Sequence, residues 1–282
     1  MTRSKALPYL LLAPATLFLC VFFLYPFVLV AHEAVTRDGA YTFANFRTMA
    51  EHWKFPATFW NTMLLAIVVV PLQLVLALTM ASIVSRVESG RGAILYIFAI
   101  PLGISDLAAG LIWLAIFEQS GFLNTWLVGL GVADQPVMFL GYQSKLSIFV
   151  AVVLAEVWRA TAIMMVILVA GMGLIPKEYG EAAEVFGASA WKRFTRVTLP
   201  LLRPSLQTAI ILRVILAFEV FAVVAALGGT NLPVLMGETY HWQFALQDRN
   251  VAAAYAMLIL AISIGFTLFF LYALRVPKEA RP

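Results

Sequence analysis

The sequence contains little charge and few of the residues from which reactive sites are usually built. Only 12% of its 282 residues are Asp, Glu, Lys or Arg, about half of the roughly 25% found in an ordinary soluble domain. Its one cysteine, Cys20, cannot form a disulfide within the chain. The three histidines, His32, His52 and His241, have no zinc-ligand spacing. We therefore expect no metal site.

Motifs for nucleotide binding and acyl transfer are also absent. No G-x-x-x-x-G-K-[ST] occurs, so the chain has no loop of the kind that cradles the phosphates of ATP. No G-x-S-x-G nucleophile motif occurs either. We expect no catalytic residues, no cofactor bound by this chain and no enzymatic activity of its own.

Long apolar runs, in contrast, fill most of the sequence. Hydrophobic residues make up 62% of the chain, and its mean hydropathy is +0.92. A bilayer core of about 30 Å needs about 20 helical residues, and six runs reach that length: residues 8–31, 58–85, 93–117, 146–172, 205–227 and 251–274. Backbone polar groups in hydrocarbon must be satisfied within each segment, and the dyad alternation of a membrane β-barrel is missing. The runs predict an all-α membrane protein with six transmembrane helices in a single domain over residues 1–282.

The distribution of basic residues predicts the orientation of these helices. The net charge of +4 would also fit a nucleic-acid partner, but in a membrane protein a basic excess usually marks the cytoplasmic side. One set of connecting segments holds twelve basic residues: Arg3, Lys5, Arg86, Arg91, Lys177, Lys192, Arg193, Arg196, Arg203, Arg275, Lys278 and Arg281. The opposite set holds five: Arg37, Arg47, Lys54, Lys145 and Arg249. We expect both termini in the cytoplasm and no nucleic-acid partner.

The largest cytoplasmic segment in this topology covers residues 176–204, between the fourth and fifth runs. Pro176 suits the first turn of a helix, and Gly187 should end it, with a second helix beginning near Ala190. Tyr179, Ala182, Ala183 and Phe186 follow the i, i+3, i+4, i+7 pattern of one apolar face. The periodicity fits a helix lying on the membrane surface and a helix that binds a partner about equally well.

The string EAAEVFGASAWKRFTRVTLPLLRP in this segment resembles the EAA motif of ABC-importer permeases. The positions that carry the resemblance are Glu181, Ala182, Ala183, Gly187, Val197, Leu199 and Pro200. Phe186 departs from the pattern, because the sugar-transporter branch usually has Asp there. The stretches FANFRTMAEHWKFPATFWNT, IPLGISDLAAGLIWLAIFEQSGFLN and AEVWRATAIMMVILVAGMGLIP are similar to other parts of sugar permeases, so the resemblance covers nearly the whole chain.

This resemblance implies a type I importer permease fold in which residues 176–204 form a coupling helix for a separate ATPase. The implied ATPase-coupling residues are Glu181, Ala182, Ala183, Phe186, Gly187, Leu199 and Pro200. The implied partners are a second permease subunit, two copies of an ATPase subunit that hold ATP and Mg²⁺, and an external solute-binding protein. The implied solute is a sugar or a related polyol.

Ionisable residues inside the runs cost about 2.5–3.5 kcal/mol each on insertion scales, so each needs a partner or a function. Glu156 and Arg159 are three residues apart and suit a mutual ion pair, whereas Arg213 and Glu219 are six apart and do not face each other. The candidates for the translocation pathway are Asp106, Trp113, Glu156, Trp158, Arg159, Arg213, Phe218, Glu219 and Asn231. For each of them, packing between helices is the competing interpretation.

Three other functions compete with a sugar importer. An ABC permease for a non-sugar solute would fit the unusual Phe186. A stand-alone secondary transporter would show an internal inverted repeat, and none is visible. A membrane-integral enzyme would need convergent polar groups at one interface, and none is apparent in the sequence.

Overall fold

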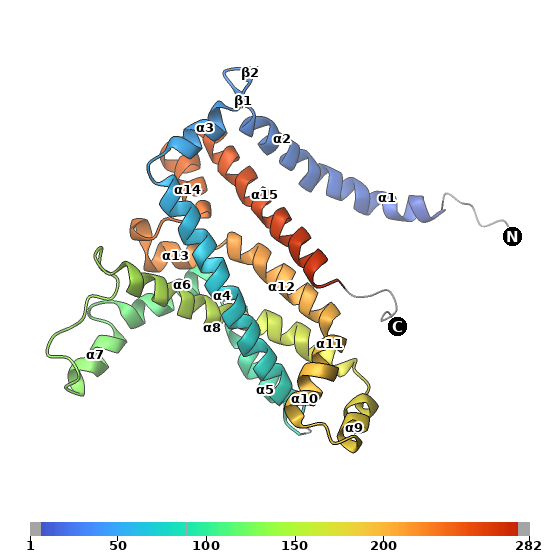
Figure 1. The fold of residues 1–282 in the computed structure, drawn as a ribbon. Helices are drawn as coiled ribbons and strands as arrows, with labels where there is room; N and C mark the ends of the chain where they lie inside the picture. The colour runs from blue at the N-terminus through green and yellow to red at the C-terminus, as the bar shows by residue number, and fades with distance from the viewer. Residues whose placement is uncertain (1–6, 88, 276–282) are drawn as a thin grey trace. The chain divides into compact units, whose positions relative to one another are not determined.

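Helices form almost all of the described structure (Figure 1). The computed structural model describes residues 7–87 and 89–275. The first half contains α1 (Leu7–Leu19), η1 (Cys20–Leu24), α2 (Tyr25–Ala34), β1 (Thr36–Arg37), β2 (Ala40–Tyr41), α3 (Ala44–Glu51), α4 (Phe55–Val84), α5 (Arg91–Ala99), η2 (Ile100–Gly103), α6 (Asp106–Phe117) and α7 (Phe122–Gly129). The second half contains α8 (Lys145–Gly173), α9 (Lys177–Val185), α10 (Ala190–Arg193), η3 (Phe194–Thr198), α11 (Leu199–Leu201), α12 (Arg203–Phe218), α13 (Ala222–Leu227), η4 (Gly229–Asn231), α14 (Leu235–Tyr240), η5 (His241–Ala245) and α15 (Arg249–Ala273).

Within residues 7–87 and 89–275, five helices are long and apolar enough to cross a membrane, or six if one bent pair counts as a single span. The five are Tyr9–Ala34, Phe55–Val84, Asp106–Gly129, Lys145–Gly173 and Arg249–Ala273. The bent pair, Ala190–Leu201 with Arg203–Phe218, turns by 72°. The all-helical membrane architecture is confirmed, and the count of six spans stays a prediction. Arg3, Lys5, Lys278 and Arg281, which supported the orientation, lie outside the described residues.

Within the predicted third span, residues 93–117, the helix is broken at Pro101, where the sequence indicated a broken helix. α5 ends at Ala99, a short 3₁₀ turn follows, and α6 starts afresh at Asp106. Pro101 lies in that turn and has no N–H for a continuing helix. Ser105 then caps α6, because its Oγ accepts a 3.2 Å hydrogen bond from the N–H of Ala108.

The predicted fifth span, residues 205–227, is divided between two helices. α12 ends at Phe218 and α13 begins at Ala222. No proline or glycine lies between them. α13 packs closely on α6, where a Cβ added to Gly110 would come within 2.7 Å of the Cβ of Ala226. The break therefore coincides with a close helix contact and carries no local sequence signal.

Contacts divide the chain into two units, residues 1–56 with 238–260 and residues 57–237 with 261–282. In the first unit, β1 and β2 form a hairpin whose turn residues Asp38 and Gly39 both have positive φ, as a type I′ turn requires. Asn45 Nδ2 donates hydrogen bonds to the carbonyls of Glu33, Ala34 and Thr36 at 3.3, 3.0 and 2.9 Å. These bonds hold the end of α2 against α3.

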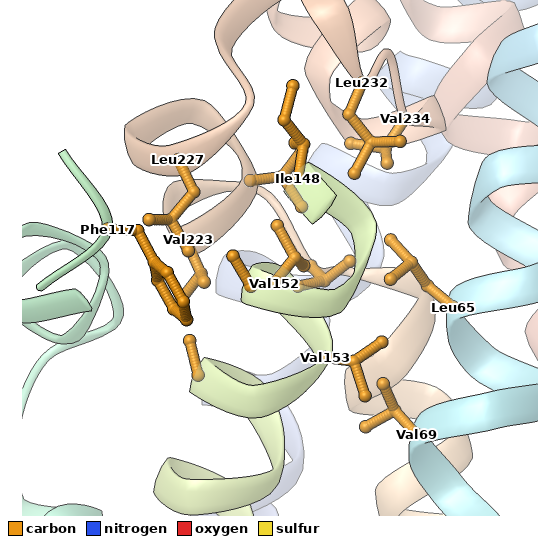
Figure 2. Close-up of a cluster of buried hydrophobic side chains, with 14 residues drawn as sticks. Leu65, Val69, Phe117, Ile148, Val152, Val153, Val223, Leu227, Leu232 and Val234 are labelled. Atoms are coloured by element: carbon orange, nitrogen blue, oxygen red, sulfur yellow. The ribbon is translucent and has the colours of Figure 1, made fainter. Parts of the chain in front are cut away.

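The second unit has a hydrophobic core centred on α8. Figure 2 shows side chains from α4, α8 and α13 meeting, among them Leu65, Val152 and Val223. The cluster consists of Leu65, Val69, Phe117, Ile148, Ala151, Val152, Val153, Ala155, Val220, Val223, Val224, Leu227, Leu232 and Val234. This packing holds α4 against α8, and both helices carry buried polar side chains within about one turn of the cluster.

Candidate functional site

Four intramembrane charges predicted as separate candidates form one network in the second unit. Arg159 Nη1 on α8 lies 2.7 Å from Asp106 Oδ1 on α6, and Arg159 Nη2 lies 3.7 Å from Glu156 Oε2. Arg213 Nη2 on α12 donates a 2.7 Å hydrogen bond to the same Glu156 Oε2. The expected Glu156–Arg159 pair is therefore present. Arg213 has its partner on another helix, as the sequence required.

Gln73 on α4 completes this network and was not predicted as a candidate. Its Oε1 accepts a hydrogen bond from Arg213 Nε, and its Nε2 donates a 2.8 Å bond to the backbone carbonyl of Glu156. Gln73 is fully buried. An amide within the otherwise apolar run 58–85 was the available signal, because a buried amide needs hydrogen-bond partners. We name Asp106, Arg159, Glu156, Arg213 and Gln73 the polar network.

The polar network has a closed end and an accessible end. The side chains of Arg213 and Glu156 are only 1% and 3% exposed, and the cavity beside them measures about 10 Å³. Such a cavity holds about one water molecule at most. At the other end, the side chain of Asp106 is 49% exposed. A solute could therefore reach Asp106, but not Arg213, in this conformation.

Two tryptophans lie on α6 and α8, the helices that carry the accessible end of the polar network. The rings of Trp113 on α6 and Trp158 on α8 meet edge to face with centroids 6.2 Å apart. Trp113 also stacks on Phe117 at 5.6 Å. Trp158 directly precedes Arg159 in the chain and is exposed. The structure thus brings six of the nine pathway candidates to one region of α6, α8 and α12.

The other three candidates do not join this region. Phe218 is buried and packs against Phe266 with ring centroids 5.2 Å apart. Glu219 is exposed at the end of α12 and forms no ion pair within residues 7–87 and 89–275. Asn231 lies half-buried in η4. For Phe218 the packing interpretation fits the structure.

The predicted coupling segment forms two short helices joined at a left-handed glycine. α9 runs from Lys177 to Val185, and Gly187 follows with φ +77°. The Gly187 N–H donates to Glu184 and the Ala188 N–H donates to Ala183, at 2.8 and 2.9 Å. These two bonds define a Schellman motif, which satisfies carbonyls that the end of a helix otherwise leaves unpaired.

α9 has no buried residue, although it presents apolar side chains. Glu181, Ala182 and Phe186 are exposed, with Phe186 91% exposed, and Ala183 is half-buried. Arg193 on α10 forms an ion pair with Glu184, which holds the two short helices together. An apolar helix face that no part of the described chain covers is a feature of binding surfaces.

The return from this segment to the membrane is bent. Leu199 and Pro200 lie in the short helix α11, after the π-helical turn η3. Pro200 and Pro204 each lie at the first positions of their helices, where a missing N–H costs nothing. The two prolines predict a break in this stretch, and the structure has one break between them: the helical run Ala190–Leu201 passes through Pro200, and the chain turns by 72° before Arg203–Phe218.

These features define a multi-span helical membrane protein with a polar network inside the bundle and an exposed helix on a connecting segment. Residues 73–281 match the family model of the binding-protein-dependent transport system inner membrane component, so the chain belongs to that family. It is therefore a multi-pass inner-membrane permease of the ABC-importer type, as the EAA resemblance predicted.

Individual relatives align along nearly the whole chain. The trehalose/maltose transport system permease protein MalF of Thermococcus litoralis is 31% identical, over 98% of this chain and 96% of its own length. The sn-glycerol-3-phosphate transport system permease protein UgpA of Agrobacterium fabrum is 26% identical, over 94% of each chain.

Solved structures have the same fold. A bacterial ABC transporter involved in the import of the acidic polysaccharide alginate superposes with a TM-score of 0.81, at 21% identity and 96% coverage of both chains. A second structure, of a bacterial alginate ABC transporter in complex with an alginate pentasaccharide-bound periplasmic protein, gives a TM-score of 0.80 at 21% identity. It covers 95% of this chain and 94% of its own.

Proposed function

We propose that this chain forms half of the translocation pathway of an ATP-driven importer for a sugar or a related polyol. An external binding protein delivers the solute, and a second permease subunit forms the other half of the pathway. Two copies of an ATPase subunit bind ATP and Mg²⁺ and drive transport, and both termini of this chain are cytoplasmic. The proposed solute class follows the names of the relatives, which transport trehalose, maltose or glycerol 3-phosphate.

The observation that carries the coupling proposal is the exposed face of α9. Ala182 permits close approach of a partner, and the exposed Phe186 fits an apolar pocket. Helix-in-groove recognition uses such an i, i+4 pair of anchors. Glu181 is exposed beside this face and suits a basic rim on the ATPase.

In the pathway proposal, the accessible end of the polar network and its two tryptophans contact the solute. Aromatic faces stack on sugar rings, and a few placed polar groups bind hydroxyls. Asp106, Arg159 and Trp158 offer both kinds of contact. Arg159 is positioned on its buried side by Glu156, which Arg213 and Gln73 hold in place.

The coupling proposal is tested by placing a bulky side chain on each face of α9. Ala182→Trp should lower ATP-dependent uptake of a labelled sugar into proteoliposomes at least about tenfold, equivalent to about 1.4 kcal/mol of docking free energy. Lys177→Trp is the matched control, because Lys177 is exposed on the opposite face of the same helix. Both variants should insert normally.

Two results would contradict the proposed function. Equal uptake by both tryptophan variants would show that this face of α9 does not couple the permease to the ATPase. Uptake of trehalose, maltose or glycerol 3-phosphate by the chain without any ATPase would favour a secondary transporter. Screening the solutes against the external binding protein by thermal shift tests the solute class separately.

A further inference from the structure

A groove between α4 and α10 has no role in the proposed transport cycle. It has a volume of about 830 Å³ and is lined by Val75, Leu78, Thr79, Ser82, Ile83, Arg86, Val87, Ala190, Trp191 and Phe194. We name it the α4–α10 groove. Its volume lies in the range of cavities that hold a small organic ligand. In Figure 1 the C-terminal end of α4 lies beside α10.

One wall of the groove is a continuous stripe along a candidate membrane span. Residues 75, 78, 79, 82, 83 and 86 follow the 3- and 4-residue spacing of one helix face. Val75 and Ile83 on this stripe are 62% and 60% exposed. The facing wall carries Trp191 and Phe194, whose rings lie 6.0 Å apart. The groove is therefore apolar at bilayer depth.

The lining of the groove changes from apolar to polar at its end. Arg86 closes the apolar stripe and also lines an adjoining cavity of about 350 Å³ with Ser82, Ser85 and Arg193. The Ser82 hydroxyl donates to the Leu78 carbonyl, and the Ser85 hydroxyl donates to the Ser82 carbonyl. The guanidinium groups therefore remain as the donors for an anion.

The two arginines differ in availability. Arg193 is engaged by Glu184. Arg86 is exposed and has no ion pair with any residue of the described ranges 7–87 and 89–275. Arg86 also lines a cavity of about 470 Å³ that Glu181 and Glu184 share, but neither carboxylate pairs with it, so its guanidinium can meet an anion at the end of the apolar groove.

We propose that the α4–α10 groove binds an anionic phospholipid of the surrounding bilayer, with an acyl chain along α4 and the phosphate at Arg86. An apolar channel that ends at an unpaired cation is complementary to an anionic amphiphile. Basic pockets between transmembrane helices on the cytoplasmic side are known to hold anionic headgroups. The proposal does not depend on the transported solute.

The test uses the complete importer in lipid nanodiscs that contain bromine-labelled acyl chains. Bromine quenches tryptophan fluorescence on contact, and the Trp191 signal is the difference between the wild-type chain and Trp191→Phe. Brominated phosphatidylglycerol should quench Trp191 at a lower mole fraction than brominated phosphatidylcholine. Thr79→Phe, which fills the groove, should reduce quenching by both lipids.

Arg86→Gln should raise the phosphatidylglycerol fraction needed for half-quenching about fivefold, which corresponds to about 1 kcal/mol for one arginine at an anionic surface. Arg91→Gln is the matched control, since Arg91 is a basic residue of the same connecting segment that does not line the groove. Equal effects of the two variants would overturn the proposal. The absence of Trp191 quenching by either lipid would also overturn it, because a protein partner would then cover the groove.

Discussion

Glu156 shows how a single side chain can organise the interior of this bundle. Its Oε2 atom is 2.7 Å from Arg213 Nη2 and 3.7 Å from Arg159 Nη2, and its backbone carbonyl accepts from Gln73. The charged residues and the i, i+3 spacing of Glu156 and Arg159 were predictable from the sequence. The bond to Arg213 was not, because it depends on how α8 and α12 pack.

At the same scale, Glu156→Gln should destabilise the protein by about 3 kcal/mol, since it leaves Arg213 buried without a carboxylate. Asp106→Asn removes the half-exposed carboxylate that pairs with Arg159. This change should lower the free energy of unfolding by at most about 1 kcal/mol. Unfolding of the purified variants in detergent, followed by circular dichroism against denaturant concentration, measures both. Equal losses would show that the polar network has no closed end.

At the scale of the element, the sequence predicted helix limits well where a proline or a glycine marked them. Pro176 and Gly187 fixed the limits of α9 to within two residues, because proline favours a helix start and a left-handed glycine ends one. The break between Phe218 and Ala222 carried no such signal, because no proline or glycine lies between these residues. The break at Pro101 is an intermediate case. The proline indicated where the helix is interrupted, but not how many residues the interruption covers.

Two glycines of the coupling segment should respond oppositely to alanine. Gly187→Ala forces a left-handed backbone on alanine and should destabilise the end of α9 by about 1 kcal/mol. Gly180→Ala lies inside α9 with open space around its Cβ and should stabilise the helix by about 0.5–1 kcal/mol. Hydrogen–deuterium exchange of residues 177–188 should become faster in the first variant and slower in the second. A slower exchange in both would contradict the left-handed assignment.

At the scale of the whole molecule, the family and the helical membrane fold followed from the apolar runs and the EAA segment. Orientation still rests on the basic residues. Cys20 is the only cysteine in the sequence, so Cys20→Ser gives a background without thiols. Ala40 and Glu178 are both exposed, one in the hairpin and one on α9.

In that background, a membrane-impermeant maleimide should label Ala40→Cys in intact cells. It should label Glu178→Cys only after the membrane is permeabilised, because the basic segments are expected in the cytoplasm. Gel shift of the labelled chain measures both. Labelling of Glu178→Cys in intact cells would reverse the topology and, with it, the side on which the ATPase docks.

The composition of the polar network has a consequence for transport in an energised membrane. It contains two carboxylates and two guanidinium groups, so its formal charge is zero. Moving one elementary charge across 100 mV of membrane potential takes about 2.3 kcal/mol. A rearrangement that shifts the four groups together moves no net charge through this field. Movement of the polar network itself should therefore be insensitive to the membrane voltage, and a voltage-dependent transport rate would have to come from other charges, such as Glu219.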